Sequence, residues 1–168
     1  SGVLVVVPYY NKPTQEGQLA HFRAVAAAVK IPLVLYNIPG RSGINMSPKT
    51  VIELSRTSNI TGIKEASGNV LQAAEILSGV ERKDFSVLSG EDALTYPLLA
   101  IGARGVISVL SNIAPALTAR LVAPFRNDLK NAPPGPGFEL FYKLLPLSQS
   151  LFIETNPGPV KAALEIMG

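Results

Sequence analysis

The chain has 168 residues, about the size of one domain, and 47% of them are apolar against 16% charged. A disordered chain is poorer in apolar residues, so a packed core is expected, and no apolar run approaches the roughly 18 residues that span a bilayer. The absence of cysteine and the presence of one histidine, His21, exclude disulfides, thiolate nucleophiles and multi-histidine metal sites. The net charge is +3, but the lysines and arginines are scattered, which does not favour nucleic-acid binding.

Short β-branched runs alternate with helical patterns along most of the chain. Strands are predicted over residues 3–7, 33–36, 60–64, 85–88 and 105–109. Helices are predicted over residues 15–29, 48–56, 70–77 and 91–101, with Asn69 as a cap and a further helix starting near Pro115. The strand starts recur about every 20 to 30 residues, which is the spacing of a βα unit. This alternation indicates a parallel sheet covered by helices.

Two closures of such a sheet are possible: an open, doubly wound sheet or a closed (β/α)₈ barrel, which usually needs about 250 residues. The chain begins inside a predicted strand, so we expect a further N-terminal portion ahead of Ser1. Residues 131–137 are rich in proline and glycine and predict a linker. Only helices are predicted beyond it, over residues 138–153 and 159–167.

Lys64 ends one of the predicted strands, and parallel α/β folds bind their ligands at such strand ends. Strand alternation predicts that Ile60, Gly62 and Lys64 share one face. A lysine that faces a barrel interior is costly unless it is paired or functional. An amine in an apolar setting loses its proton more readily, and it can then attack a carbonyl to form a Schiff base. The plainer alternative is a lysine that pairs with Glu65 or extends to the barrel rim.

Two further candidates follow the preceding strand. Tyr36 ends it, and its phenol could lie near Lys64 and relay a proton, although an aromatic ring that only packs is the common case. Arg41 lies in residues 39–43, a predicted flexible turn above the strand end. There it could bind a carboxylate through two hydrogen bonds, or it could simply be solvated.

Five segments of the chain, in order and spacing, resemble the dihydrodipicolinate synthase family. They are PYYNKP at residues 8–13, YNIPGRSG at 36–43, GIKEASGN at 62–69, SGED at 89–92 and GVIS at 105–108. The spacing from tyrosine to lysine and the second string are highly specific. The resemblance implies an α/β fold of the (β/α)₈ TIM-barrel type, represented here by its C-terminal five βα units. Residues 1–130 would then hold strands four to eight, and residues 131–168 would hold a truncated C-terminal helical region.

The resemblance implies a Schiff-base-forming lyase that condenses pyruvate with aspartate semialdehyde. The product would be 4-hydroxy-tetrahydrodipicolinate, on the diaminopimelate route to lysine. Lys64 resembles the lysine that forms the pyruvate enamine, and Tyr36 resembles the tyrosine that shuttles protons. Arg41 resembles the arginine that holds the carboxylate of the semialdehyde.

Three more residues take roles from the same resemblance. Tyr10 resembles a catalytic tyrosine that a neighbouring subunit inserts into the site. The backbone of Ile107 matches a carbonyl that lines the pyruvate site, and Gly90 would lie at the same pocket. The family's relay threonines would precede Ser1. The resemblance further implies a cytoplasmic homotetramer that uses no metal and no cofactor.

Two alternatives remain open at this point. One is a related pyruvate aldolase, of the N-acetylneuraminate lyase or keto-deoxy-sugar aldolase type, which would share the lysine and the tyrosine. Arg41 favours the synthase, because a short second substrate bearing a carboxylate calls for a fixed guanidinium, whereas a sugar needs hydroxyl-binding groups. The other alternative is a non-catalytic α/β fragment that binds a partner.

Overall fold

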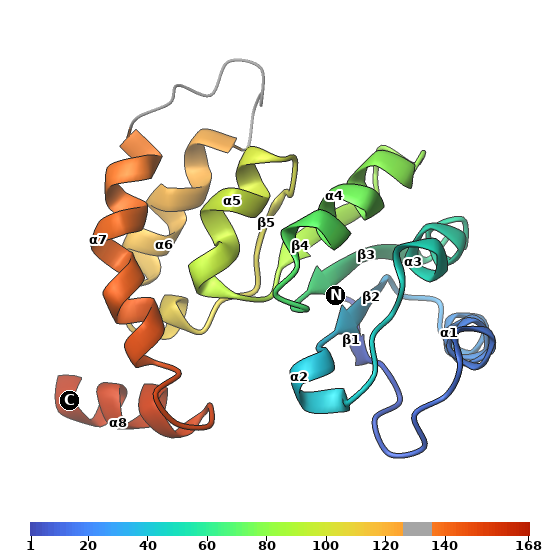
Figure 1. Cartoon of the computed structure of the whole chain (residues 1–168), viewed down its shortest axis with the longest axis horizontal. Coiled ribbons are helices and arrows are strands. Elements are labelled where there is room, and N and C mark those ends of the chain that lie inside the picture. Colours follow the sequence, from blue (N-terminus) through green and yellow to red (C-terminus); the bar gives the residue numbers. More distant parts are fainter. Residues whose placement is uncertain (126–135) are drawn as a thin grey trace. The chain divides into compact units, whose positions relative to one another are not determined.

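The computed structural model of the protein describes residues 1–125 and 136–168. The chain forms two compact units, Ser1–Leu88 and Ser89–Gly168 (Figure 1). The expected boundary between residues 130 and 131 lies outside the described residues, as does most of the expected linker at 131–137.

The first unit alternates strands with helices (Figure 1). Its strands are β1 (Val3–Val6), β2 (Leu33–Asn37), β3 (Ile60–Glu65) and β4 (Ser86–Ser89), the last of which ends at the first residue of the second unit. Its helices are α1 (Gln15–Ala28), α2 (Pro39–Ser42), α3 (Pro48–Ser55) and α4 (Val70–Gly79). The strands are neighbours in chain order, and β2 pairs in parallel with both β1 and β3. The predicted parallel βα arrangement is confirmed.

The core of the first unit lies between the sheet and the helices α1, α3 and α4, which run side by side along one face (Figure 1). Its largest fully buried apolar side chains are Val7, Phe22, Leu33, Leu35, Met46, Leu54, Ile60, Ile63 and Ile76. Each buried side chain of this size removes apolar surface from water, which is worth about 1.5–3 kcal/mol. The same packing leaves the opposite face of the sheet free to line a cavity.

These three helices all begin at a polar N-cap side chain that accepts a hydrogen bond from a backbone N–H of the first turn. The cap is Thr14 for α1, Ser47 for α3 and Asn69 for α4. A proline, Pro48, occupies the first turn of α3, where its missing N–H leaves no bond unmade. The predicted cap at Asn69 and the predicted proline start are confirmed.

The segment after β2 differs from expectation. Residues 39–43, predicted as a flexible turn, form the one-turn helix α2. Gly43 ends it in the left-handed region at φ 69°, and its N–H donates to the carbonyl of Pro39. The hydroxyl of Ser42 is buried and donates 2.9 Å bonds to the carbonyls of Ile38 and Ile44. Arg41 therefore extends from an ordered turn.

Strand β3 contains a one-residue irregularity opposite β2. Leu33 is paired with Ile60, but the next residue, Val34, is paired with Gly62, so Thr61 is the extra residue. Ile60 and Ile63 consequently both pack in the helix-covered core. The prediction that Ile60 shares a face with Lys64 is wrong, because the irregularity reverses the alternation between them.

Gly62 is needed for a close approach between strands. A Cβ atom at this position would lie 2.5 Å from the carbonyl oxygen of Ser86 in β4, nearer than such atoms can approach. The space beside Gly62 is therefore taken by the backbone of the adjacent strand.

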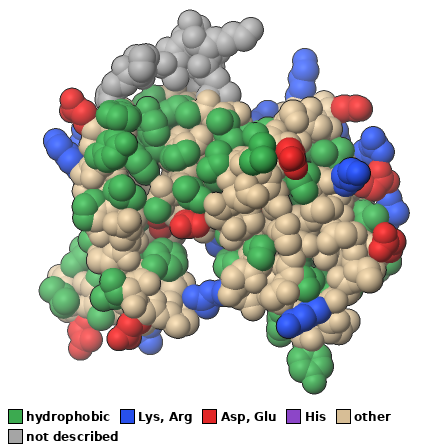
Figure 2. All heavy atoms as spheres, viewed as in Figure 1, with side chains coloured by type: hydrophobic (Ala, Val, Ile, Leu, Met, Phe, Trp, Pro, Cys, Tyr) green, Lys and Arg blue, Asp and Glu red, His purple; other side chains and the backbone are tan. Residues whose placement is uncertain are grey.

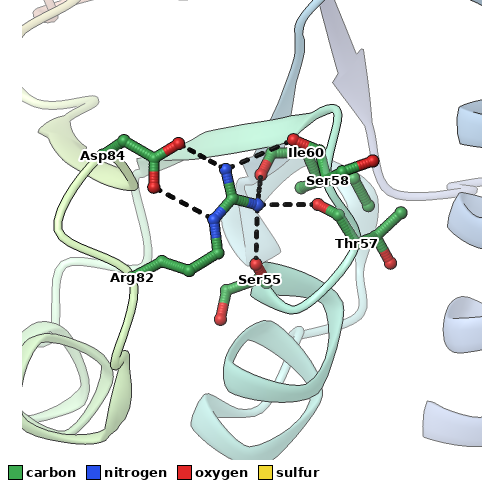
Figure 3. A network of polar contacts seen from close by, with 6 residues as sticks. All are labelled: Ser55, Thr57, Ser58, Ile60, Arg82 and Asp84. Carbon is green, nitrogen blue, oxygen red and sulfur yellow. Dashed lines mark hydrogen bonds and ion pairs between the residues drawn. The ribbon is translucent and has the colours of Figure 1, made fainter.

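The side chain of Arg82 connects several backbone segments at the end of the first unit that lies opposite the carboxyl ends of the strands (Figure 3). Its guanidinium donates to the carbonyls of Ser55, Thr57, Ser58 and Ile60 over 2.8–3.2 Å. It also forms a bidentate pair with Asp84, at 2.6 and 3.0 Å. This hydrogen bonding with Asp84 raises the pKa of Arg82. The last turn of a helix leaves backbone carbonyls without partners inside the helix. The Arg82 guanidinium binds such carbonyls at the end of α3 and also binds the start of β3.

The second unit is mainly helical. It contains β5 (Gly105–Val106), α5 (Thr95–Ala100), α6 (Pro115–Val122), α7 (Pro136–Ser150) and α8 (Gly158–Met167), with short 3₁₀ turns η1 (Asp92–Leu94), η2 (Leu110–Asn112) and η3 (Ala123–Phe125). Its core consists of Leu110, Leu121, Leu144, Leu151 and Val160. No helix in the part of the chain that the structure describes could cross a membrane.

Two predicted elements of this unit are shorter than expected. The helix predicted over 91–101 is divided into η1 and α5, because Pro97 has no N–H for a continuous helix and fits only within the first turn of α5. Strand β5 ends at Val106 rather than residue 109. The backbone N–H groups of Val109 and Leu110 donate instead to the buried carboxylate of Asp92, both at 2.9 Å.

The two units present different surfaces. On the face shown in Figure 2, apolar side chains gather over the region of α5 to α7, and the exposed apolar residues of α7 include Phe138 and Tyr142. Lysine and arginine side chains are dispersed on that face. This dispersion agrees with the scattered basic residues of the sequence.

We predict that Gly62→Ala destabilises the complete protein by about 1–3 kcal/mol, because the new methyl group overlaps the backbone of β4. Urea denaturation followed by circular dichroism measures the loss. Gly40→Ala is the matched control, since a Cβ there has nothing within 4 Å. Equal stability of the Gly62 variant and the control would contradict the proposed overlap.

We also predict that Arg82→Lys lowers the free energy of unfolding by about 1–3 kcal/mol, because one ammonium cannot serve four carbonyls and a carboxylate. Arg56→Lys is the control: Arg56 pairs with Glu53 at the surface, and such pairs contribute about 0–1 kcal/mol. Equal losses in the two variants would show that the Arg82 carbonyl contacts contribute little.

Candidate active site

An open cavity of about 460 Å³ lies at the carboxyl ends of β1 and β2, within the first unit. It is lined by Leu4, Val6, Tyr9, Tyr36, Ile38, Arg41 and Ser42. Strand pairing explains part of this lining, because Val6 of β1 is paired with Tyr36 of β2 and both line the cavity. A mostly apolar wall with one guanidinium suits a small ligand that carries a carboxylate.

Lys64 and Tyr36 lie side by side. They are paired residues of β3 and β2, and the Lys64 Nζ lies 4.2 Å from the centroid of the Tyr36 ring. The face of a phenol ring attracts a cation electrostatically. The structure thus brings the predicted amine and phenol together, with the ammonium over the ring face rather than beside the hydroxyl.

Glu65 is not the partner of Lys64 that the plainer alternative requires. It is 3% exposed, and consecutive strand residues point to opposite faces of a sheet. Its carboxylate accepts hydrogen bonds from the backbone of Ser67 and from the side chains of Asn37 and Gln72. Lys64 itself is only partly buried and shares its face with Tyr36.

The other predicted residues of the first unit occupy two loops. Arg41 is in α2, is exposed and lines the cavity. Tyr10 follows β1 and is 93% exposed, whereas its neighbour Tyr9 lines the cavity. The structure therefore brings Lys64, Tyr36 and Arg41 to one end of the sheet, while Tyr10 extends into solvent.

Gly90 and Ile107 belong to the second unit. The N–H of Ile107 donates to the carbonyl of Ser89 at 2.9 Å, which brings it beside the residue that precedes Gly90. Asp92 holds the chain just after Ile107 through its bonds to the backbone of Val109 and Leu110. These two predicted residues are thus adjacent within their own unit.

The sequence reasoning missed a polar cluster behind the site, in which Asn37, Glu65 and Gln72 are buried and Asn45 is exposed. Its members are Asn37, Asn45, Glu65 and Gln72, which are joined by side-chain hydrogen bonds of 2.7–3.4 Å. One signal was available: Asn37 and Glu65 directly follow Tyr36 and Lys64, so alternation turns both toward the core, where polar groups need partners.

Comparison with known proteins places this arrangement in a family. The sequence model of the dihydrodipicolinate synthetase family matches residues 1–168. The chain is 52% identical over 168 residues to 4-hydroxy-tetrahydrodipicolinate synthase of Syntrophus aciditrophicus, covering 99% of this chain and 56% of that one. It is 47% identical over 169 residues to the synthase of Methanococcoides burtonii, covering 100% of this chain and 56% of that one.

Solved structures agree in fold. The dihydrodipicolinate synthase of Cyanidioschyzon merolae with lysine bound has a TM-score of 0.92 and 47% identity, covering 99% of this chain and 55% of that one. The Acinetobacter baumannii enzyme complexed with pyruvate has a TM-score of 0.91 and 41% identity, covering 98% and 55%. These neighbours are TIM-barrel enzymes, which confirms the predicted fold class. The chain spans about half the length of the relatives it matches. It belongs to the dihydrodipicolinate synthetase family.

Proposed function

We propose that the complete protein condenses pyruvate with aspartate semialdehyde through a Schiff base on Lys64. The product is 4-hydroxy-tetrahydrodipicolinate, on the diaminopimelate route to lysine. The observation that carries the proposal is the Lys64 amine lying over Tyr36 at the end of the sheet that Arg41 also faces. Membership of the family supports it, as does the pyruvate bound by the Acinetobacter baumannii relative.

The chemistry begins at the Lys64 amine. Its nitrogen attacks the keto carbon of pyruvate, water leaves, and a protonated imine remains. The imine nitrogen is a cation, and the face of the Tyr36 ring, over which Nζ lies, attracts a cation. The pyruvate methyl then loses a proton to give an enamine, whose terminal carbon attacks the aldehyde. The Tyr36 hydroxyl carries protons to and from these intermediates.

Arg41 binds the carboxylate of the second substrate, aspartate semialdehyde. Its guanidinium lines the cavity and extends from an ordered helical turn. Two parallel N–H groups of a guanidinium can bind a carboxylate through two hydrogen bonds. The semialdehyde has such a carboxylate close to its aldehyde. A sugar aldolase would instead need groups that bind hydroxyls. Arg41 therefore favours the synthase over the related aldolases.

The remaining assignments follow from the family. Ile107, through its backbone carbonyl, and Gly90 contribute to pyruvate binding. Tyr10, which is 93% exposed here, acts from a neighbouring subunit in a homotetramer. A side chain this exposed on its own chain suits a role in another, because interfaces are enriched in tyrosine. The complete protein works in the cytoplasm and requires no cofactor.

We predict that borohydride reduction in the presence of pyruvate attaches the substrate covalently to Lys64. Peptide mass mapping of the complete protein should find the adduct on the peptide containing Gly62–Glu65. Lys64→Ala should abolish it, whereas Lys49→Ala, which changes an exposed lysine of α3, should leave it intact. An adduct on another lysine, or turnover that survives Lys64→Ala, would contradict the assignment.

We further predict that Arg41→Ala weakens use of aspartate semialdehyde by about 10- to 150-fold, the value of a lost charged hydrogen bond of about 1.5–3 kcal/mol. Pyruvate adduct formation on Lys64 should be unchanged. Steady-state kinetics with each substrate varied in turn measures the difference. Equal loss for both substrates would make Arg41 structural, and preferential turnover of a sugar acid by the wild type would favour an aldolase.

A further inference from the structure

A buried carboxylate lies directly behind the candidate site. Glu65 follows Lys64 in β3, and its carboxylate is enclosed on the helix-covered side of the sheet, with the side chain 3% exposed. One oxygen accepts from the Ser67 N–H at 2.7 Å. The other accepts from the amides of Gln72 at 3.1 Å and Asn37 at 3.2 Å. Both oxygens of Glu65 therefore act as acceptors of N–H groups.

The hydrogen bonds continue from Glu65 to three other segments. The Asn37 amide donates to Asn45 at 2.8 Å, and its oxygen accepts from the Met46 N–H at 2.9 Å. Asn45 and Gln72 form a reciprocal amide pair, at 2.7 and 3.2 Å. The network thus joins the end of β2, the end of β3, the start of α4 and the segment between α2 and α3.

Backbone N–H groups, which can only donate, determine which atom donates and which accepts at each hydrogen bond of this network. The N–H groups of Met46 and Ser67 can only donate, so Asn37 must present its oxygen to Met46 and its NH₂ to Glu65. An amide at position 65 would place its NH₂ either against the Ser67 N–H or against the NH₂ groups of Asn37 and Gln72, and all of these groups are donors. A neutral isostere therefore cannot satisfy the network.

We infer that Glu65 is a positioning residue for the amine of Lys64, an inference that rests on the proposed function. Asn37 and Glu65 are paired residues, each immediately after one of the paired residues Tyr36 and Lys64. Their side-chain hydrogen bond links β2 to β3 one residue beyond Tyr36 and Lys64. The backbone N–H of Ala66 still donates to the Asn37 carbonyl at 2.9 Å, so loss of the side-chain bond loosens the strand ends rather than separating them. Such loosening displaces Nζ from the Tyr36 ring, and misplacement of about 1 Å costs up to about 100-fold in rate.

The test uses Glu65→Gln in the complete protein, with the rate of borohydride-trapped pyruvate adduct as the readout. We expect trapping and kcat to fall about 10- to 100-fold at a temperature where circular dichroism shows the variant fully folded. Glu75→Gln removes the same charge from an exposed position on α4 and should leave both rates unchanged. Arg82→Lys weakens the opposite end of the same strand, so it controls for lost stability.

A structural role alone would lower the rates of Glu65→Gln and Arg82→Lys only in proportion to the unfolded fraction. Trapping at the wild-type rate in folded Glu65→Gln would overturn the inference while leaving the proposed function intact. A wild-type protein that forms no adduct would overturn both. If Glu65→Gln fails to fold, Gln72→Met removes a single donor from the carboxylate, and an unchanged trapping rate there would also overturn the inference.

Discussion

The parallel pairing of β2 with β3, with its one-residue irregularity at Thr61, is the constraint on which the site depends. Ile60 before the irregularity and Ile63 after it both pack in the core. In a regular strand that kept Ile60 in the core, Lys64 would point among the helices, because a shift of one residue moves every following side chain to the opposite face. The irregularity turns Lys64 toward Tyr36, and Gly62 allows β4 to approach closely enough to complete this part of the sheet.

The end of β3 carries opposite charges on its two faces, and each is balanced separately. Glu65 is compensated by N–H donors in the core, while Lys64 lies over an aromatic ring on the cavity side. Directing the carboxylate to the other face leaves the amine beside the Tyr36 ring instead of beside Glu65. The same separation makes Glu65 available to hold the strand ends together.

Most secondary structure of the first unit could be predicted from local pattern. The apolar runs of β1 and β2, the cap at Asn69 and the proline start of α3 each depend on residues a few positions apart. The candidate site could also be predicted, because Lys64 and Tyr36 end predicted strands and Arg41 lies in the predicted turn just after one of them. The family resemblance indicated a specific reaction for these residues. The predicted fold and family are confirmed.

Most of the features that sequence reasoning missed depend on distant parts of the chain. The face of Ile60 is set by pairing with β2, the need for Gly62 by the backbone of β4, and the partners of Glu65 by residues 7 and 28 positions away. The helix α2 was missed because its glycines and proline are also typical of turns, and it is held by hydrogen bonds of Ser42 and Gly43. Strand β5 was overextended because the apolar residues Ile107 and Val109 follow it, while the backbone already turns toward Asp92.

The most direct measurement is a crystal structure of the complete protein soaked with pyruvate. The account predicts continuous electron density from the Lys64 Nζ to the keto carbon of pyruvate, with the Tyr36 ring beside the adduct and Glu65 still bonded to Asn37. Pyruvate attached to a different lysine, or bound without a covalent link while the protein turns over, would contradict it.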